Sequence, residues 1–446
     1  MDLTISKPLT LNCGLVLPNR LVKVPMSEQM ASKANDYLPD EAFSAVYRTW
    51  ADGGWGMILT GAVQIDPSFL STPTDAAFDA SLAPKRLHTH WTRWASSSRT
   101  SSTTSTTPPA ALVMQLNHPG RQSPAAAGRR PRCAQNVAAS PLALDMGGGW
   151  LARSVVSAVF GTPRALEEEE VGDVVGRFAA AAREAARAGW DGVEVHAAHG
   201  FLLSTFLTAK SNQRTDRYGG SARNRARIVV EVVEAIRKAT PAGFCVGVKL
   251  NSADHQTAEA LRDSIEQIEA IAEAGIDFLE ISGGSYEDPR MMADANYDDV
   301  EADPSDQSKP STAAREAFFL DFARSIRSHF PSLTLMVTGG FRTRLGMEAA
   351  VAGTTTASGG ADDVDSACDL VGIGRPAVLQ PSAPRDVILN SKVADDDARL
   401  REEKVEVPRL ARMSGIRGVG SGATSVSVLF LLWWRVMEAC WLTGWM

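Results

Sequence analysis

The stretch Gly192-Val-Glu-Val-His196-Ala-Ala-His199-Gly200 indicates how this chain folds. Its β-branched residues alternate with others as in a strand, which we expect to end near His196. A turn after the strand would bring His199 to the same edge. Two imidazoles there can hydrogen-bond one oxygen of a ligand. One histidine could instead cap a helix while the other fills space, but a pair at a strand end favours a ligand site.

Runs of this kind occur eight times, separated by segments with helical spacing of apolar residues. The expected strands are Arg20–Met26, Trp55–Val63, Ala111–Asn117, Gly192–Ala198, Cys245–Asn251, Phe278–Gly284, Thr334–Gly340 and Cys368–Gly374. The expected helices are Asp40–Asp52, Leu82–Ala95, Glu167–Ala188, Ala222–Ala239, Thr257–Ala274, Ala313–Phe330 and Arg344–Ala352. Eight strands alternating with helices predict parallel pairing in an α/β fold, a single (β/α)8 TIM barrel over residues 1–390. In that fold the chemistry lies at the C-terminal ends of the strands, where His196 and His199 fall.

Glycines follow the last two expected strands. Gly339 and Gly340 end the seventh strand, and Gly374 and Arg375 end the eighth. Barrels often bind phosphate in these two loops. Glycine N–H groups can approach a phosphate closely, and a guanidinium adds two charge-assisted hydrogen bonds. The pattern favours a phosphate site over glycines that only turn the chain.

Six motifs occur in order on different expected strands. They are Pro18-Asn19-Arg20 through Val24-Pro25-Met26, Gln115 through Gln122, the His196/His199 segment, Val246-Gly-Val-Lys249-Leu-Asn251, Thr338-Gly-Gly340 and Gly372-Ile-Gly374-Arg375-Pro376. Together they resemble the Old Yellow Enzyme family over about residues 3–390. This family comprises FMN-dependent NAD(P)H:flavin oxidoreductases and ene-reductases built on a (β/α)8 barrel. The resemblance implies FMN as cofactor, NADH or NADPH as reductant, and an electron-poor alkene, quinone or related small molecule as acceptor.

The resemblance also implies roles for individual residues. Gly339, Gly340, Gly374 and Arg375 match positions that hold the FMN phosphate. Gln115 would bond the pyrimidine edge of the flavin, and Lys249 would stabilise negative charge near N1 and O2 of the reduced ring. The alternative for Gln115 is a hydrogen bond to loop backbone, and the alternative for Lys249 is an ion pair at the barrel mouth. Further flavin-lining positions match Pro25, Met26, Ser27 and Ala62.

In the family, the positions of His196 and His199 bind the carbonyl or nitro oxygen of the acceptor and polarise its double bond. A tyrosine two residues after the second histidine commonly protonates the α carbon, but this chain has Phe201 there. Water or another group, such as Tyr286, could replace it, or the acceptor could need no such proton. A degenerate flavin-binding barrel with little turnover is the alternative function.

Composition favours a soluble enzyme, with 44% hydrophobic and 22% charged residues. A net charge of −7 argues against nucleic acid as a partner. The cysteines are scattered without a C-x-x-C pair, which argues against an iron–sulfur cluster and for a reducing, cytoplasmic location. A zinc site on the two histidines lacks clear further ligands, so we expect no metal. Met1–Asn12 has no apolar segment of the secretory type.

Three segments fit a barrel poorly. Ser96–Pro109 and Gly353–Ser366 have the composition of flexible insertions, although retained non-coding sequence in the gene model is an alternative. Residues 391–446 would form a C-terminal extension. Within it, Val426–Trp434 is too short to cross a bilayer, and its spacing predicts an amphipathic helix packed on the barrel or on a partner. A homo-oligomer stays open as an alternative.

Overall fold

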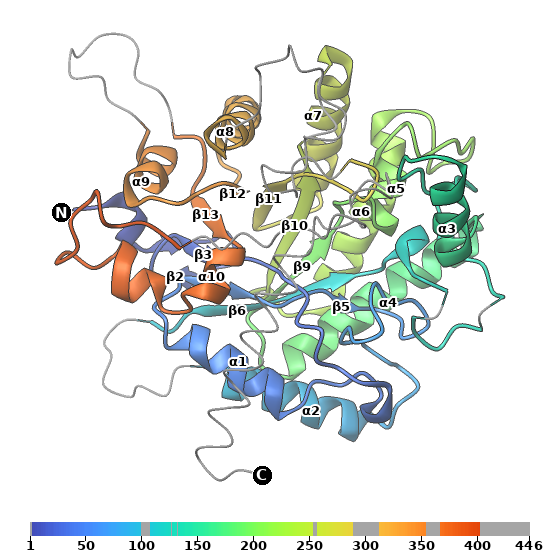
Figure 1. Cartoon of the computed structure of the whole chain (residues 1–446), viewed down its shortest axis with the longest axis horizontal. Helices are drawn as coiled ribbons and strands as arrows, with labels where there is room; N and C mark the ends of the chain where they lie inside the picture. Colours follow the sequence, from blue (N-terminus) through green and yellow to red (C-terminus); the bar gives the residue numbers. More distant parts are fainter. Residues whose placement is uncertain are drawn as a thin grey trace.

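The computed structural model describes residues 2–99, 108–125, 127–131, 133–252, 257–288, 312–353 and 366–401. Eight parallel strands form a closed barrel in which each strand pairs with two neighbours and the last pairs with the first (Figure 1). They are β3 (Leu21–Lys23), β4 (Met57–Leu59), β6 (Ala111–Asn117), β9 (Gly192–His196), β10 (Cys245–Asn251), β11 (Phe278–Ser282), β12 (Leu335–Thr338) and β13 (Leu370–Ile373). The predicted (β/α)8 barrel is therefore confirmed.

Helices join successive strands and cover the outside of the barrel, and one short helix follows the last strand (Figure 1). They are α1 (Glu41–Ala51), α2 (Pro84–Ser97), α4 (Glu168–Arg187), α6 (Ala222–Ala239), α7 (Ala258–Glu273), α8 (Thr312–His329), α9 (Arg344–Ala352) and the short α10 (Arg375–Leu379). The longest, α4, begins with a reciprocal capping box between Glu167 and Glu170. It ends before Gly189, whose φ of 90° favours glycine. Its buried side includes Val171, Val174 and Phe178, so its apolar face packs on the barrel.

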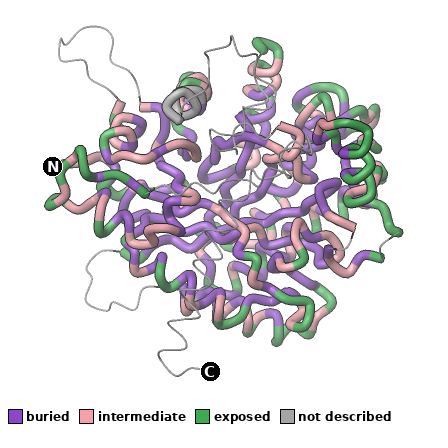
Figure 2. Tube along the Cα trace, in the orientation of Figure 1, coloured by how far each residue is buried: buried purple, intermediate pink, exposed green. Residues whose placement is uncertain are grey.

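Side chains inside the barrel form an apolar layer at its N-terminal end. Val22, Met57, Val113, Phe278 and Met336 belong to one buried cluster to which seven of the eight strands contribute. The hairpin of β1 (Leu9–Thr10) and β2 (Val16–Leu17) closes this end, because Leu11 and Leu17 belong to the same cluster. Figure 2 shows that the buried residues lie at the centre of the molecule and that partly exposed helices surround them. Alternation along the strands places a second, polar layer above the apolar one.

One ion-pair arrangement occurs three times at the N-terminal end of the barrel. Asp277, just before β11, accepts a hydrogen bond from the backbone of Val246 at 2.7 Å and from Arg237 at 2.6 Å. An aspartate before β9 and one before β13 repeat it, each with the backbone of the preceding barrel strand and with an arginine in or just after the helix before that strand; the pairs are Asp191 with Arg99 and Asp369 with Arg327. The aspartates fix the starts of alternate strands, so their role is structural.

Several boundaries and elements differ from the sequence predictions. The strand expected over Arg20–Met26 is only three residues long, and Pro25 has no N–H for a ladder bond beyond it. Between β6 and α4 the structure has an unpredicted helix, α3 (Trp150–Phe160), and a short pair of β7 (Val137–Ala138) with β8 (Arg164–Ala165). A short helix α5 (Leu202–Leu207) and strand β5 (Val63–Gln64) were also missed.

Parts of the three irregular segments lie outside the described residues. Ser96 and Ser97 belong to the end of α2, but residues 100–107 of the first expected insertion are not described. The same holds for 354–365 of the second insertion and for 402–446 of the C-terminal extension, including its expected amphipathic helix. Among the helices of the described ranges, none has the length and apolar character needed to cross a membrane.

Candidate active site

The two histidines meet as expected at the C-terminal end of β9. His196 is its last residue, and His199 lies in the following turn with a left-handed φ of 60°. His196 Nε2 and His199 Nδ1 are 2.9 Å apart, within hydrogen-bond distance, and His199 Nε2 is 3.1 Å from Ser282 Oγ at the end of β11. Gln122 Nε2 donates to the His199 carbonyl at 2.8 Å, which holds the turn in place.

Both imidazoles are neutral at pH 7. Burial lowers the pKa of His196 well below its usual value, and the nearby His199 and Lys249 lower it further. The pKa of His199 is lowered for the same reasons, burial first and then Lys249. A neutral imidazole has one N–H donor and one acceptor nitrogen. His196 Nδ1 is buried and has no hydrogen-bond partner among the described residues.

A polar layer lies inside the barrel beside the histidines. Lys249 on β10 is in register with His196 on β9 and Glu280 on β11, and its Nζ is 2.6 Å from Glu280 Oε1. Gln115 on β6 is in register with Glu194 on β9 and donates from Nε2 to Glu194 Oε1 at 2.7 Å. The layer therefore joins two residues predicted from the sequence with two glutamates that were missed.

Gln115 and Lys249 lie inside their strands, each two residues before the end, because β6 ends at Asn117 and β10 at Asn251 as predicted. Both side chains are buried inside the barrel. A signal for the missed glutamates was present, since Glu194 and Glu280 are single acids within otherwise apolar strands.

The four residues of the expected phosphate site occupy two adjacent loops. Gly339 and Gly340 directly follow β12, and Gly374 and Arg375 directly follow β13, which pairs with β12. Gly340 has a φ of 71°, which favours glycine. A Cβ on Gly339 would lie 2.7 Å from the ring of Phe319, so a side chain does not fit there. All four are partly exposed at this end of the barrel.

The segments after β3 and β4 approach each other closely. A Cβ on Gly61, next to Ala62, would lie 2.4 Å from the backbone oxygen of Met26, which follows Pro25. Ser27 Oγ donates to the buried carboxylate of Asp75 at 3.1 Å. The structure thus brings the four expected flavin-lining positions to neighbouring loops.

A second buried charged cluster lies beside these loops and was not predicted. Lys23 donates to the backbone of Leu59 at 2.8 Å and lies 4.2 Å from the centre of the Trp50 ring. Glu28 accepts from the hydroxyl of Tyr47 and from the backbone N–H of Gly61. Burial lowers the pKa of Lys23 to about 8, against the opposing effect of Glu28. The lysine within the apolar run Leu21–Pro25 was the available signal.

Aromatic rings border the histidines on one side. The Phe201 ring centre is 4.8 Å from that of His196 and 6.4 Å from that of Tyr286, which also faces Phe160 of α3 at 6.4 Å. Burial raises the pKa of the Tyr286 phenol, and the charge of Asp75 raises it further. The site therefore has Phe201 where it was expected, with Tyr286 as the nearby phenol.

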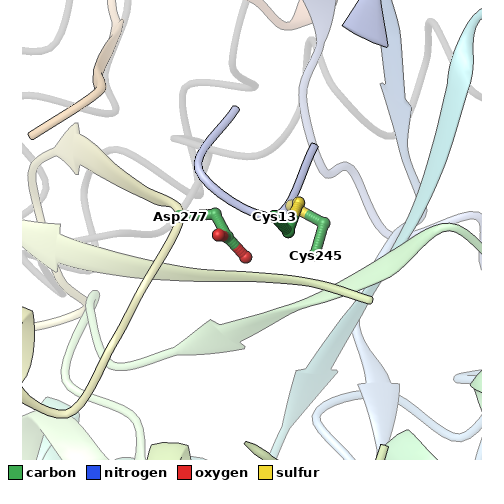
Figure 3. Close-up of side chains that lie close together, drawn as sticks. All are labelled: Cys13, Cys245 and Asp277. Atoms are coloured by element: carbon green, nitrogen blue, oxygen red, sulfur yellow. The ribbon is translucent and has the colours of Figure 1, made fainter. Parts of the chain in front are cut away.

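The opposite end of the barrel holds a group of possible metal ligands. Cys13, Cys245 and Asp277 offer ligand atoms that all lie within 4.8 Å of one another (Figure 3). The sequence did not predict that the two thiols meet, because a long stretch of chain separates them. Asp277, however, already accepts from Arg237, as the two equivalent aspartates do from their arginines. A guanidinium bound to the carboxylate opposes a cation there.

Known proteins resemble this chain in sequence and in fold. The profile of the NADH:flavin oxidoreductase / NADH oxidase family matches residues 99–316. An NADH-dependent flavin oxidoreductase of Neonectria sp. (strain DH2) is 46% identical over 94% of this chain, which spans 52% of that protein. One of Hypocrea jecorina (strain QM6a) is 41% identical over 96% of this chain and 99% of its own length. The structure of morphinone reductase aligns with a TM-score of 0.64 and 23% identity, covering 91% of this chain and 92% of that one. At that identity the likeness shows the fold.

Proposed function

The chain belongs to the NADH:flavin oxidoreductase / NADH oxidase family, the Old Yellow Enzyme family, and we propose that it uses FMN to pass hydride from NADH to an electron-poor alkene, quinone or related acceptor. The family makes it a flavin-dependent oxidoreductase. Two of its relatives are named as NADH-dependent, which supports NADH over NADPH. One observation carries the proposal most directly: two neutral histidines meet at the C-terminal end of the barrel, and one of them, His196, is in register with the buried Lys249.

The residues present fit FMN. Gly339, Gly340, Gly374 and Arg375 would hold the phosphate, because two adjacent glycine loops and a guanidinium suit a dianion. Gln115 and Lys249 would face the pyrimidine side of the ring. Pro25, Met26, Ser27 and Ala62 would line its other edge. When bound, the flavin supplies the hydride-accepting and hydride-donating centre that no side chain offers.

His196 and His199 would bind the acceptor. Their nitrogens Nε2 and Nδ1 are 2.9 Å apart, and in their mutual hydrogen bond one of these nitrogens is the acceptor. When that ring takes its other tautomer, a carbonyl oxygen that displaces the mutual hydrogen bond can accept one N–H from each ring. Since both imidazoles are neutral, they give hydrogen bonds without a full positive charge. Such donors stabilise the negative charge that develops on the oxygen as hydride reaches the β carbon.

Protonation of the α carbon needs another group, because Phe201 has no acidic hydrogen. Tyr286 is the nearest phenol to Phe201 in the described site, with ring centres 6.4 Å apart. Water is the other source. Quinone acceptors take their protons at oxygen and need neither, so the Phe201 position favours them over simple enones. Membership of a family of named enzymes disfavours a degenerate barrel without turnover.

Stopped-flow absorbance tests the proposal. The purified protein should show flavin absorbance that NADH bleaches and that an enone or quinone restores. Absence of bound FMN would refute the cofactor, and a flavin that NADH bleaches but no acceptor restores would support the degenerate barrel instead.

A further inference from the structure

Three ionisable side chains form a buried cluster inside the barrel: Lys249, Glu194 and Glu280. Lys249 is 3% exposed, and the two glutamates are fully buried. Lys249 Nζ is 2.6 Å from Glu280 Oε1, while Glu194 Oε2 and Glu280 Oε2 are buried and accept no hydrogen bond from a described residue. Two buried carboxylates beside a single ammonium would leave one negative charge unpaired, whereas a proton on one acid can be donated to a free oxygen of the other.

The electrostatics of the two acids diverge. Burial raises the pKa of Glu194 well above its usual value, and the neighbouring Glu280 raises it further. Burial opposes ionisation of Glu280 too, but the charge of Lys249 outweighs it and lowers the pKa of Glu280. With one proton between the two acids, their single negative charge balances the single positive charge of Lys249.

We propose that Glu194 and Glu280 share one proton and, as one negative charge, neutralise Lys249 where it faces the flavin, which lowers the redox potential of the bound cofactor. This inference rests on the proposed function, because it takes Lys249 to lie beside the flavin. An unbalanced cation there would stabilise the reduced, more negative flavin. The glutamates act through Lys249 and are positioning residues.

Proton sharing predicts a specific pattern among variants. In E194Q the shared proton is lost and Glu280 carries the single negative charge. In E280Q Glu194 loses the proton and carries that negative charge instead. Each single variant therefore keeps the cluster neutral. Only the double variant E194Q/E280Q leaves Lys249 unbalanced. Two independent structural effects would add instead.

The first test needs no flavin. Infrared difference spectra of the purified full-length protein at pH 7, with ¹³C-labelled glutamate, should show a protonated carboxyl band that disappears in E194Q and equally in E280Q. Persistence of the same band in both single variants would overturn proton sharing, whatever the protein does with FMN. Taking differences between variants removes the bands of any protonated acid outside the cluster.

The second test is the midpoint potential of the bound flavin, measured by equilibration with a reference dye. We expect each single variant to change the ratio of oxidised to reduced FMN dissociation constants less than threefold. The double variant should raise it at least tenfold, or about 30 mV for a two-electron couple. Adding K249Q to the double variant should return the potential towards that of the wild type. Additive shifts, or no shift in the double variant with FMN bound, would overturn the inference, whereas failure to bind FMN would overturn the proposed function.

Discussion

His118 should make the protein sensitive to acid, by an amount that its surroundings set. The side chain is buried at the end of β6, and its Nδ1 accepts a hydrogen bond from the backbone N–H of Gly120 at 3.0 Å. Burial is the main cause that lowers its pKa from 6.5 to about 4; the charge of Asp66 opposes this shift, and Arg177 and Arg130 contribute to it. Protonation would place a hydrogen on Nδ1 against that N–H.

The sign follows from the unfolded chain, in which a histidine takes up its proton near pH 6.5. The neutral ring favours the folded protein fully above pH 6.5, and this contribution is lost as the pH falls from 6.5 to about 4. At about 1.4 kcal/mol per pKa unit, the loss is about 3 kcal/mol of unfolding free energy. His118 also holds the turn containing Gln122, which positions His199, so acid should loosen the site as well.

The measurement is urea unfolding of the wild type and H118N at pH 7 and pH 4. Asparagine keeps an acceptor near Nδ1 but does not titrate, and other acids and histidines contribute equally to both proteins. The wild type should lose about 3 kcal/mol more than H118N over this range. H329N, at the exposed end of α8, should behave like the wild type. Equal losses in the wild type and H118N would show that His118 titrates normally and refute the argument.

Three further predictions concern the site. R375A should weaken FMN retention through gel filtration at least tenfold, because it removes charge-assisted hydrogen bonds to the phosphate that are worth about 1.5–3 kcal/mol each. The control R385A, at the surface, should retain FMN, and equal retention by both variants would contradict the phosphate assignment. H196A/H199A should keep its FMN but bind phenol-type ligands at least tenfold more weakly, as followed by their long-wavelength charge-transfer absorbance; intact phenol binding would place the pair elsewhere. F201Y should raise the rate of enone reduction, by at most the factor of about 10²–10⁴ that a positioned general acid contributes, and should leave the rate of quinone reduction nearly unchanged. Stopped-flow reoxidation of the flavin by each acceptor measures the two rates. Equal effects on both rates would mean that another group already donates the proton.

The local pattern of the chain was sufficient to predict the barrel. Strands buried on both sides show up as short β-branched runs, and the helices between them have apolar faces with a regular period. The run Ala111–Asn117 and the helix Ala222–Ala239 have the same bounds in the structure. The strand at Arg20–Met26 was too long, because ladder pairing with β13 and β4 rather than composition decides where a strand stops. The helix α3 was missed although Ala152, Val156 and Phe160 recur along it at helical spacing.

The sequence by itself also determined which residues lie near the C-terminal ends of the strands, and so which groups gather at one end of the barrel. Motifs at His196, Lys249 and Gly339 mark that end without any knowledge of distances. Only the tertiary structure decided the electrostatics there. The pairing of Lys249 with Glu280, and the meeting of Glu280 with Glu194, depend on the register of β9, β10 and β11. Registers are set by the closure of the whole barrel, so residues far apart in the chain acquire their ionisation states only when all eight strands are in place.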